Sequence, residues 1–341
     1  MKPVAAALCL FLFRVPVAAG LEAPFSVLAS RGLIDTAIVL GVNQEYGRLV
    51  PLLKERALRE PGNPLFPFYL MVAYEAMMID YETTQWEAQF DSLGQVSEKG
   101  FRRLLKAGKE PAWMNYVLGI LYVTQGAHEL RFANYLTFTK SILRGISLLK
   151  KSVAMDSTLN DAWLYLGAFT YARAELMSWL PFVEEDREEA VRMIETARQR
   201  SLFSREVSQQ VLIGLYGRMD EVARAESLAQ DFRARYPENR AVYFLLANVY
   251  LSKKRYAEAK REFEALKPLI AKIPLQYDYN RLSVDASLAQ AAFQLGDYGG
   301  CVKLCDGILS FSSKDVRSAK FKKFARKYKA RAEKKLQPKS P

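Results

Sequence analysis

The chain has 341 residues, half of them apolar and a quarter charged, which suffices for two average domains or for one extended array of repeats. Its formal charge of +12 is unevenly placed, because residues 314–341 hold 12 Lys and Arg against two acidic residues, a net of +10. The remainder carries only about +2, which excludes a uniformly basic nucleic-acid-binding protein. The single histidine, His128, argues against most hydrolases and metal enzymes.

The first 20 residues have the pattern of an export signal. Lys2 precedes an apolar run over residues 4–13, and Val17-Ala18-Ala19 supplies small residues of the kind found at cleavage sites. As a helix this run would span about 15 Å, roughly half of a bilayer core, so it is not predicted to cross a membrane. We expect residues 1–19 to be a signal peptide cleaved near Ala19 and the protein to be periplasmic or secreted. An uncleaved tether or a misassigned start is the alternative.

Residues 26–63 are predicted to be a degenerate N-terminal helical segment. Tyr46, Leu49 and Leu53 have the spacing of only half of the pattern that follows later in the chain. The breaker sequence 61–64 (Pro-Gly-Asn-Pro) ends this segment, because Pro and Gly both disfavour continuation of a helix. Residues 64–311 are then predicted to form a helical repeat array.

A repeat with a fixed period organises that array. Leu246, Tyr250 and Ala259 follow Leu212, Tyr216 and Ala225 at a constant spacing of 34 residues. A period of this length, with small and aromatic residues at set offsets, is typical of stacked helix hairpins. Leu and Tyr pairs at the same offset recur earlier at longer spacings, which indicates lengthened helices and turns. The fullest copy consists of Tyr243, Leu246, Ala247, Tyr250, Tyr256, Ala259, Phe263 and Leu266, and another unit opens with Trp163, Leu166 and Gly167.

On these residues the chain resembles the tetratricopeptide repeat (TPR) family. The resemblance implies an all-α fold, a right-handed superhelical solenoid of antiparallel helix hairpins. It also implies a concave groove, lined by the first helix of each hairpin, that takes a protein or peptide partner. Transferred unit by unit, the groove residues are Phe68, Val72, Trp113, Tyr116, Ile120, Leu164, Tyr171, Phe244 and Asn248. The alternative is that the longer N-terminal helices fold over this strip and make it core.

The last segment, residues 312–341, is predicted to be a basic capping helix and tail. Its exposed cations would be Lys320, Lys322, Lys323, Arg326, Lys327, Lys329 and Arg331. Terminal repeats need a polar outer face, which a capping helix provides. The same cations could instead dock the protein on an anionic surface, either membrane lipid or polymer, or nucleic acid in a cytoplasmic protein.

Sequence motifs for catalysis are missing. The chain has no phosphate-binding Gly-rich loop, no nucleophile elbow and no zinc-protease motif. Asp80, Glu82 and Glu87 are interpreted as a solvated face beside packing aromatics, and Cys301 and Cys305 as small core residues on one helix face. We therefore predict a non-enzymatic scaffold or adaptor of the cell envelope, with no cofactor, metal site or small-molecule substrate.

Overall fold

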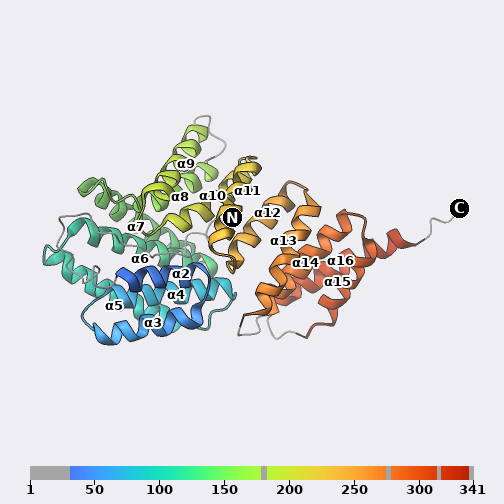
Figure 1. Cartoon of the computed structure of the whole chain (residues 1–341), viewed down its shortest axis with the longest axis horizontal. Helices are drawn as coiled ribbons and strands as arrows, with labels where there is room; N and C mark the ends of the chain where they lie inside the picture. Colours follow the sequence, from blue (N-terminus) through green and yellow to red (C-terminus); the bar gives the residue numbers. More distant parts are fainter. Residues whose placement is uncertain (1–30, 178–182, 274–277, 313–315, 338–341) are drawn as a thin grey trace.

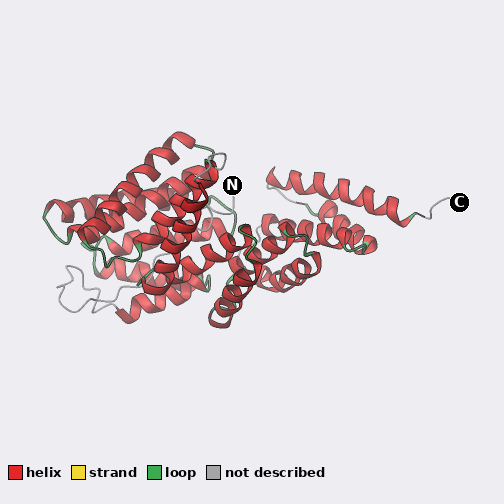
Figure 2. Ribbon diagram, turned by 90° about the horizontal axis from the view of Figure 1, so that it is seen from above, coloured by secondary structure: helices red, strands yellow, loops and turns green. Residues whose placement is uncertain are grey.

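The computed structural model describes residues 31–177, 183–273, 278–312 and 316–337. These residues form 15 α-helices and no strands. The helices follow one another as antiparallel pairs, and a last helix packs against the final pair (Figures 1 and 2). The predicted all-α helical repeat solenoid is thus confirmed.

Of these helix pairs, the first is the shortest and the third is the longest. In chain order they are α2 (Arg31–Val42) with α3 (Tyr46–Arg59), α4 (Leu65–Asp80) with α5 (Glu87–Lys106), α6 (Pro111–Arg131) with α7 (Tyr135–Met155), α8 (Ala162–Leu176) with α9 (Val183–Arg200), α10 (Arg205–Arg218) with α11 (Val222–Arg235), α12 (Arg240–Ser252) with α13 (Tyr256–Ala271), and α14 (Asp278–Gln294) with α15 (Tyr298–Ser310). A 3₁₀ turn, η1 (Val316–Ser318), leads into α16 (Ala319–Leu336). The helices of 21 residues, α6 and α7, account for the long spacing predicted in this part of the chain.

Small residues set the approach of the two helices within a pair. A Cβ atom on Gly119 of α6 would lie 2.7 Å from Cγ of Leu149, and one on Gly145 of α7 would lie 2.7 Å from the carbonyl oxygen of Gly119. Both distances are shorter than real carbon contacts allow. The α6–α7 pair can therefore pack this closely only with glycine at both positions.

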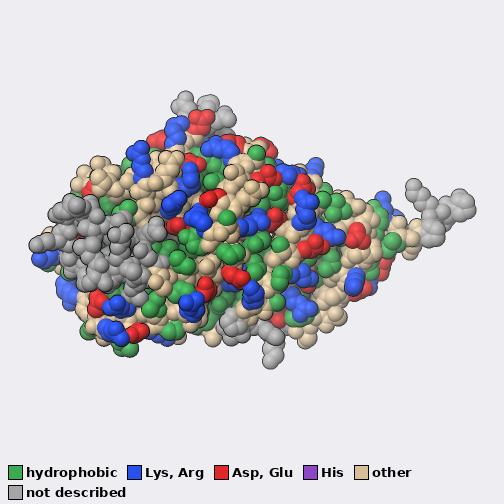
Figure 3. All heavy atoms as spheres, in the orientation of Figure 1, with side chains coloured by type: hydrophobic (Ala, Val, Ile, Leu, Met, Phe, Trp, Pro, Cys, Tyr) green, Lys and Arg blue, Asp and Glu red, His purple; other side chains and the backbone are tan. Residues whose placement is uncertain are grey.

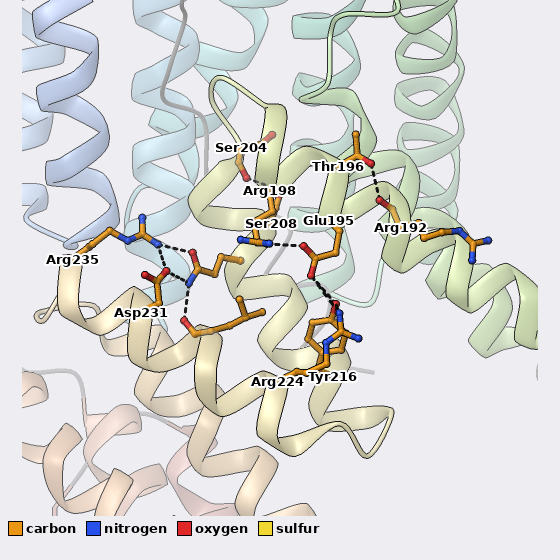
Figure 4. A network of polar contacts seen from close by, with 12 residues as sticks. Arg192, Glu195, Thr196, Arg198, Ser204, Ser208, Tyr216, Arg224, Asp231 and Arg235 are labelled. Carbon is orange, nitrogen blue, oxygen red and sulfur yellow. Dashed lines mark hydrogen bonds and ion pairs between the residues drawn. The ribbon is translucent and has the colours of Figure 1, made fainter.

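The recurring Tyr landmarks make polar contacts between neighbouring helix pairs. The Tyr216 hydroxyl hydrogen-bonds Glu195 Oε1 of the preceding pair at 2.7 Å, and the Arg224 guanidinium lies 3.9 Å from the centroid of the Tyr216 ring (Figure 4). Arg224 also pairs with Glu195 at 3.8 Å, so three side chains from three helices close a triangle. The same arrangement joins Tyr122 to Glu98 and Arg144, and Tyr250 to Glu226 and Arg255.

One buried carboxylate fixes the turn between α9 and α10. Asp161 is fully buried and accepts hydrogen bonds from the backbone N–H groups of Leu202 at 2.9 Å, Phe203 at 2.6 Å and Ser204 at 2.8 Å. The Ser204 hydroxyl donates a fourth bond at 3.0 Å. Burial raises the pKa of Asp161 from 3.8 to about 6, and the hydrogen bonds oppose that shift.

This raised pKa predicts a pH-dependent contribution to stability. The folded protein holds the Asp161 proton more tightly than the unfolded chain does, so this residue's contribution increases as the pH falls from about 6 towards 3.8. Asp161→Asn removes the titration and places an amide N–H₂ against backbone N–H donors. We expect the variant to be less stable, with the gap to the wild type widening by on the order of 1–3 kcal/mol between pH 7 and pH 4. Urea unfolding of both proteins across that range measures the gap. A constant gap would contradict the prediction.

Candidate interaction site

The predicted groove does not exist in the N-terminal half of the array. The residues at 68, 72, 116, 120, 164 and 171 are all nearly inaccessible to solvent, which corrects the prediction that they line an open strip. In this conformation they belong to the hydrophobic core: Phe68, Val72, Tyr116, Ile120, Leu164 and Tyr171. For these six residues the structure agrees with the alternative interpretation, in which the strip becomes core.

Aromatic packing is the physical reason for this burial. Phe203, from the turn held by Asp161, stacks on Tyr116 with ring centroids 6.2 Å apart and meets the half-buried Trp113 edge-on at 5.8 Å. Phe68 packs edge-on against Phe101 of α5 at 5.7 Å. A partner could reach these rings only by separating the helices.

A buried ion pair links the start of the array to its later part. Asp80, at the end of α4, pairs with Arg240, the first residue of α12, through two hydrogen bonds, that from Nε to Oδ1 being 3.1 Å long. Both side chains are at least nine-tenths buried. Burial raises the pKa of Asp80, and the Arg240 guanidinium opposes the shift. This pair joins residues 160 positions apart in the sequence.

Further hydrogen bonds surround that pair. Asn239 caps α12 by accepting from the N–H of Val242 at 3.0 Å, while its amide donates to the carbonyl oxygen of Val42, the last residue of α2. The Gln44 side chain accepts from the backbone N–H of Arg240 at 2.7 Å, and Asn280 of α14 donates to the carbonyl oxygen of Asp80 at 2.6 Å. The first pairs of the array are thereby tied to α12 and α14.

This arrangement also corrects the interpretation of the acidic residues near Trp86. Asp80 is not on a solvated face, because it is buried in the ion pair with Arg240. Glu82 is half-buried and pairs with Arg317 at 3.1 Å, whereas Glu87 is exposed at the start of α5. The sequence carries no local signal for these partners, which lie more than 150 residues away.

The histidine is part of a sealed polar cluster. His128 Nδ1 lies 2.6 Å from Glu75 Oε2, and both side chains are almost completely buried. Phe90 stacks on the imidazole with centroids 4.4 Å apart, and Arg131 donates to the carbonyl oxygens of Met78 and Thr83. The cluster ties α4 to α6 and is closed to solvent, so it is not placed to meet a substrate.

The predicted groove residues that remain accessible lie elsewhere. Asn248 of α12 is exposed, and its amide N–H donates to the carbonyl oxygen of Phe244 at 2.8 Å, while its own oxygen accepts no hydrogen bond from the described residues. Phe244 is half-buried and packs edge-on against Phe263. Hydrophobic side chains gather in the middle of the face shown in Figure 3, where α12 and α13 lie in Figure 1. A short accessible strip therefore survives on α12.

Within the basic segment, residues 319–336 form one helix, α16, and only some of its cations are without partners among the described residues. Phe321, Ala325 and Ala332 of α16 pack against α14 and α15, as a capping helix does. Of the predicted cations, three contact their own repeat: Lys320 reaches Tyr279, Lys329 reaches Asp306 at 2.5 Å, and Arg331 lies over Phe293. The other four have no ion-pair partner within the described part of the chain: Lys322, Lys323, Arg326 and Lys327.

Comparison with known proteins establishes the fold. No protein-family model matches the sequence, and no curated protein matches it either. A chain of the APC/C hetero-tetramer Cut9–Hcn1 superposes with a TM-score of 0.53 at 15% identity, over 93% of this chain and 54% of that one. This protein therefore spans about half of that structure's length. The fold is that of a TPR-like helical solenoid.

Two other solved structures align at lower TM-scores. The C-terminal part of a TPR repeat-containing protein from Cytophaga hutchinsonii gives a TM-score of 0.44 at 14% identity, over 84% of this chain and 98% of its own. Yeast Tom70 gives a TM-score of 0.37 at 13% identity, over 97% of this chain and 70% of its own.

The cysteines of the TPR-like solenoid lie where the sequence places them. Cys301 and Cys305 are buried free thiols on the inner face of α15, and burial raises the pKa of Cys305 to about 12. A thiol with such a pKa is a poor nucleophile. Among the described residues, no group of His, Cys, Asp and Glu is arranged to hold a metal ion, and no helix there is long and apolar enough to cross a bilayer.

Breaking the Asp80–Arg240 pair should destabilise the whole array. Arg240→Met leaves a carboxylate buried without its counter-charge, which costs about 3–5 kcal/mol in comparable sites. Arg48→Met removes an exposed pair with Glu45 and should cost less than about 1 kcal/mol. Urea denaturation followed by circular dichroism measures both. A loss of similar size in the two variants would show that the buried pair does not hold the array together.

Proposed function

We propose that this protein is a non-enzymatic scaffold that is exported to the cell envelope and binds another protein there. The observation that carries the proposal is the solenoid itself, which presents a long surface built from repeated helix pairs and has its buried acidic groups committed to structure. Asp80 is paired, Asp161 accepts four hydrogen bonds, and Glu75 meets His128 in a sealed cluster. The structure that superposes at a TM-score of 0.53 comes from a hetero-tetramer, which supports a role in protein assembly.

The proposed partner surface on α12 is accessible without any rearrangement. Asn248 offers its amide oxygen to a partner backbone, and Phe244 beside it offers part of an aromatic ring. Aromatic side chains next to hydrogen-bonding groups are common anchors in protein interfaces. The buried strip over residues 68–171 has no part in the proposal.

Export is supported by the pattern of the first 20 residues, which lie outside the described part of the chain. We expect mass spectrometry of the natural protein to find a mature N-terminus at Gly20, in the soluble envelope fraction. The physical reason is that the apolar run is too short to remain as a membrane span. A chain that begins at Met1 in the cytoplasm would contradict export and leave the scaffold proposal without its compartment.

Site-specific photo-crosslinking tests the partner surface. With p-benzoylphenylalanine in place of Ser252, we expect one specific adduct in envelope extracts, because this exposed position lies one helical turn after Asn248 and the change leaves Asn248 and Phe244 in place. The same amino acid at Leu58 of α3, a highly exposed position far from α12, is the matched control. An identical set of adducts from both positions, or none from either, would count against the proposed surface.

A further inference from the structure

A hollow of about 900 Å³ lies between the α3–α4 turn and the outer side of α5. Its apolar part is formed by Pro61, Pro64 and Pro67 together with the exposed side chain of Val96. The predicted groove included none of these residues. Apart from Pro64, its lining residues are exposed or half-buried, so the hollow is accessible without any rearrangement.

The shape of this hollow is fixed before anything binds. A Cβ atom on Gly100 would lie 2.5 Å from Cβ of Pro64, so the turn packs directly on α5 with no space to move inward. Asn63 is held by its amide, which donates to Glu60 at 3.0 Å, and its oxygen accepts from the N–H of Leu65 at 3.0 Å. A preformed site loses little conformational entropy on binding.

The lining of the hollow includes cations that have no counter-charge among the described residues. Lys99, Arg103 and Lys106 have no ion-pair partner in the part of the chain that the structure describes, whereas Arg102 between them is engaged by Glu98 and Tyr122. The arginines of α11 behave differently, because each lies within ion-pair distance of a carboxylate: Arg224, Arg233 and Arg235. The lone acidic residue of the hollow, Glu98, is already shared by Arg102 and Arg144.

We infer that this hollow binds an extended acidic segment of a partner protein. The three cations follow one another at intervals of four and three residues, so they line one side of α5 with roughly 6 and 4.5 Å between successive positions along its axis. Alternate side chains of an extended peptide are about 6.5–7 Å apart, a somewhat wider spacing that the long, flexible Lys and Arg side chains can follow, so each can meet one carboxylate. The peptide side chains between the carboxylates would contact the three prolines and Val96.

The observations favour a protein segment over a membrane. The exposed cations and the apolar residues line one hollow together, so a flat bilayer would contact the cations without entering the hollow to cover Pro64 and Pro67. This inference rests on the proposal that the protein binds another protein, and it names the chemistry of the segment that is bound.

The test uses a short fluorescein-labelled peptide of alternating Glu and Val and the full mature chain. We expect binding by fluorescence anisotropy that weakens with salt and falls by about tenfold or more in Lys99→Glu/Arg103→Glu/Lys106→Glu, because three attractive pairs become repulsive. The matched control, Lys323→Glu/Arg326→Glu/Lys327→Glu in α16, makes the same change in net charge and should bind as the wild type does. All six side chains are exposed or lie at the surface, and thermal melts check that each variant folds.

A second variant tests the apolar surface separately from charge. Val96→Ser should weaken binding of the Glu–Val peptide while leaving that of a Glu–Ser peptide unchanged. The inference is overturned if the wild type binds no peptide, if the α16 control loses binding equally, or if vesicles with anionic lipid bind through Lys99, Arg103 and Lys106 while the peptide does not.

The two proposals fail in different ways. An envelope partner captured equally by the wild type and the α5 triple variant would overturn this site and leave the scaffold function intact. Peptide binding that is lost in the triple variant, without any specific adduct from the envelope, would support the site and contradict the scaffold function as proposed.

Discussion

The buried Asp80–Arg240 pair is the constraint on which the architecture depends. A charge taken out of water must be paired and hydrogen-bonded, because an unpaired one costs several kcal/mol. Here the two partners lie on helices from distant parts of the chain. The side chains of Asn239, Gln44 and Asn280 make their hydrogen bonds across the same helix contact. The array therefore cannot open at this point without stranding several polar groups at once.

Because the early helix pairs are held against α12 and α14, the first helices of the N-terminal hairpins have a structural role and do not line a groove. In an open solenoid these helices would present side chains to a groove, but α4 and α6 are buried on almost every side, and Tyr116 stacks under Phe203. Large aromatic residues give this interior its stability, at roughly 1.5–3 kcal/mol for each buried side chain. The cost is the loss of a binding surface, so recognition is left to α12, the turns and the outer helices.

The sequence was sufficient for whatever depends on local spacing. The start of α4 at Leu65 follows from the breaker sequence before it, and the short loop before α15 follows from Gly296 and Asp297, whose carboxylate caps that helix. It was insufficient for Asp80 and Arg240, because two residues 160 positions apart share no pattern that one sequence can reveal. Counting charge by segment also concealed the hollow beside α5, since its cations are balanced in the sum by acidic residues, such as Glu87 and Asp91 of the same helix, that do not pair with them.

Charge pairing in the repeats explains why those cations stand out. Each Tyr–Glu–Arg triangle uses a glutamate from the preceding hairpin to hold an arginine over the ring, so structural arginines along the array have carboxylate partners. In α5 the glutamate of the triangle is Glu98, and it contacts Tyr122, Arg102 and Arg144 together. Nothing in the packing of the helix requires Lys99, Arg103 and Lys106 as well, and three like charges on one side of a helix repel one another. A carboxylate-bearing partner would relieve that repulsion, which gives these residues a physical reason to act in recognition.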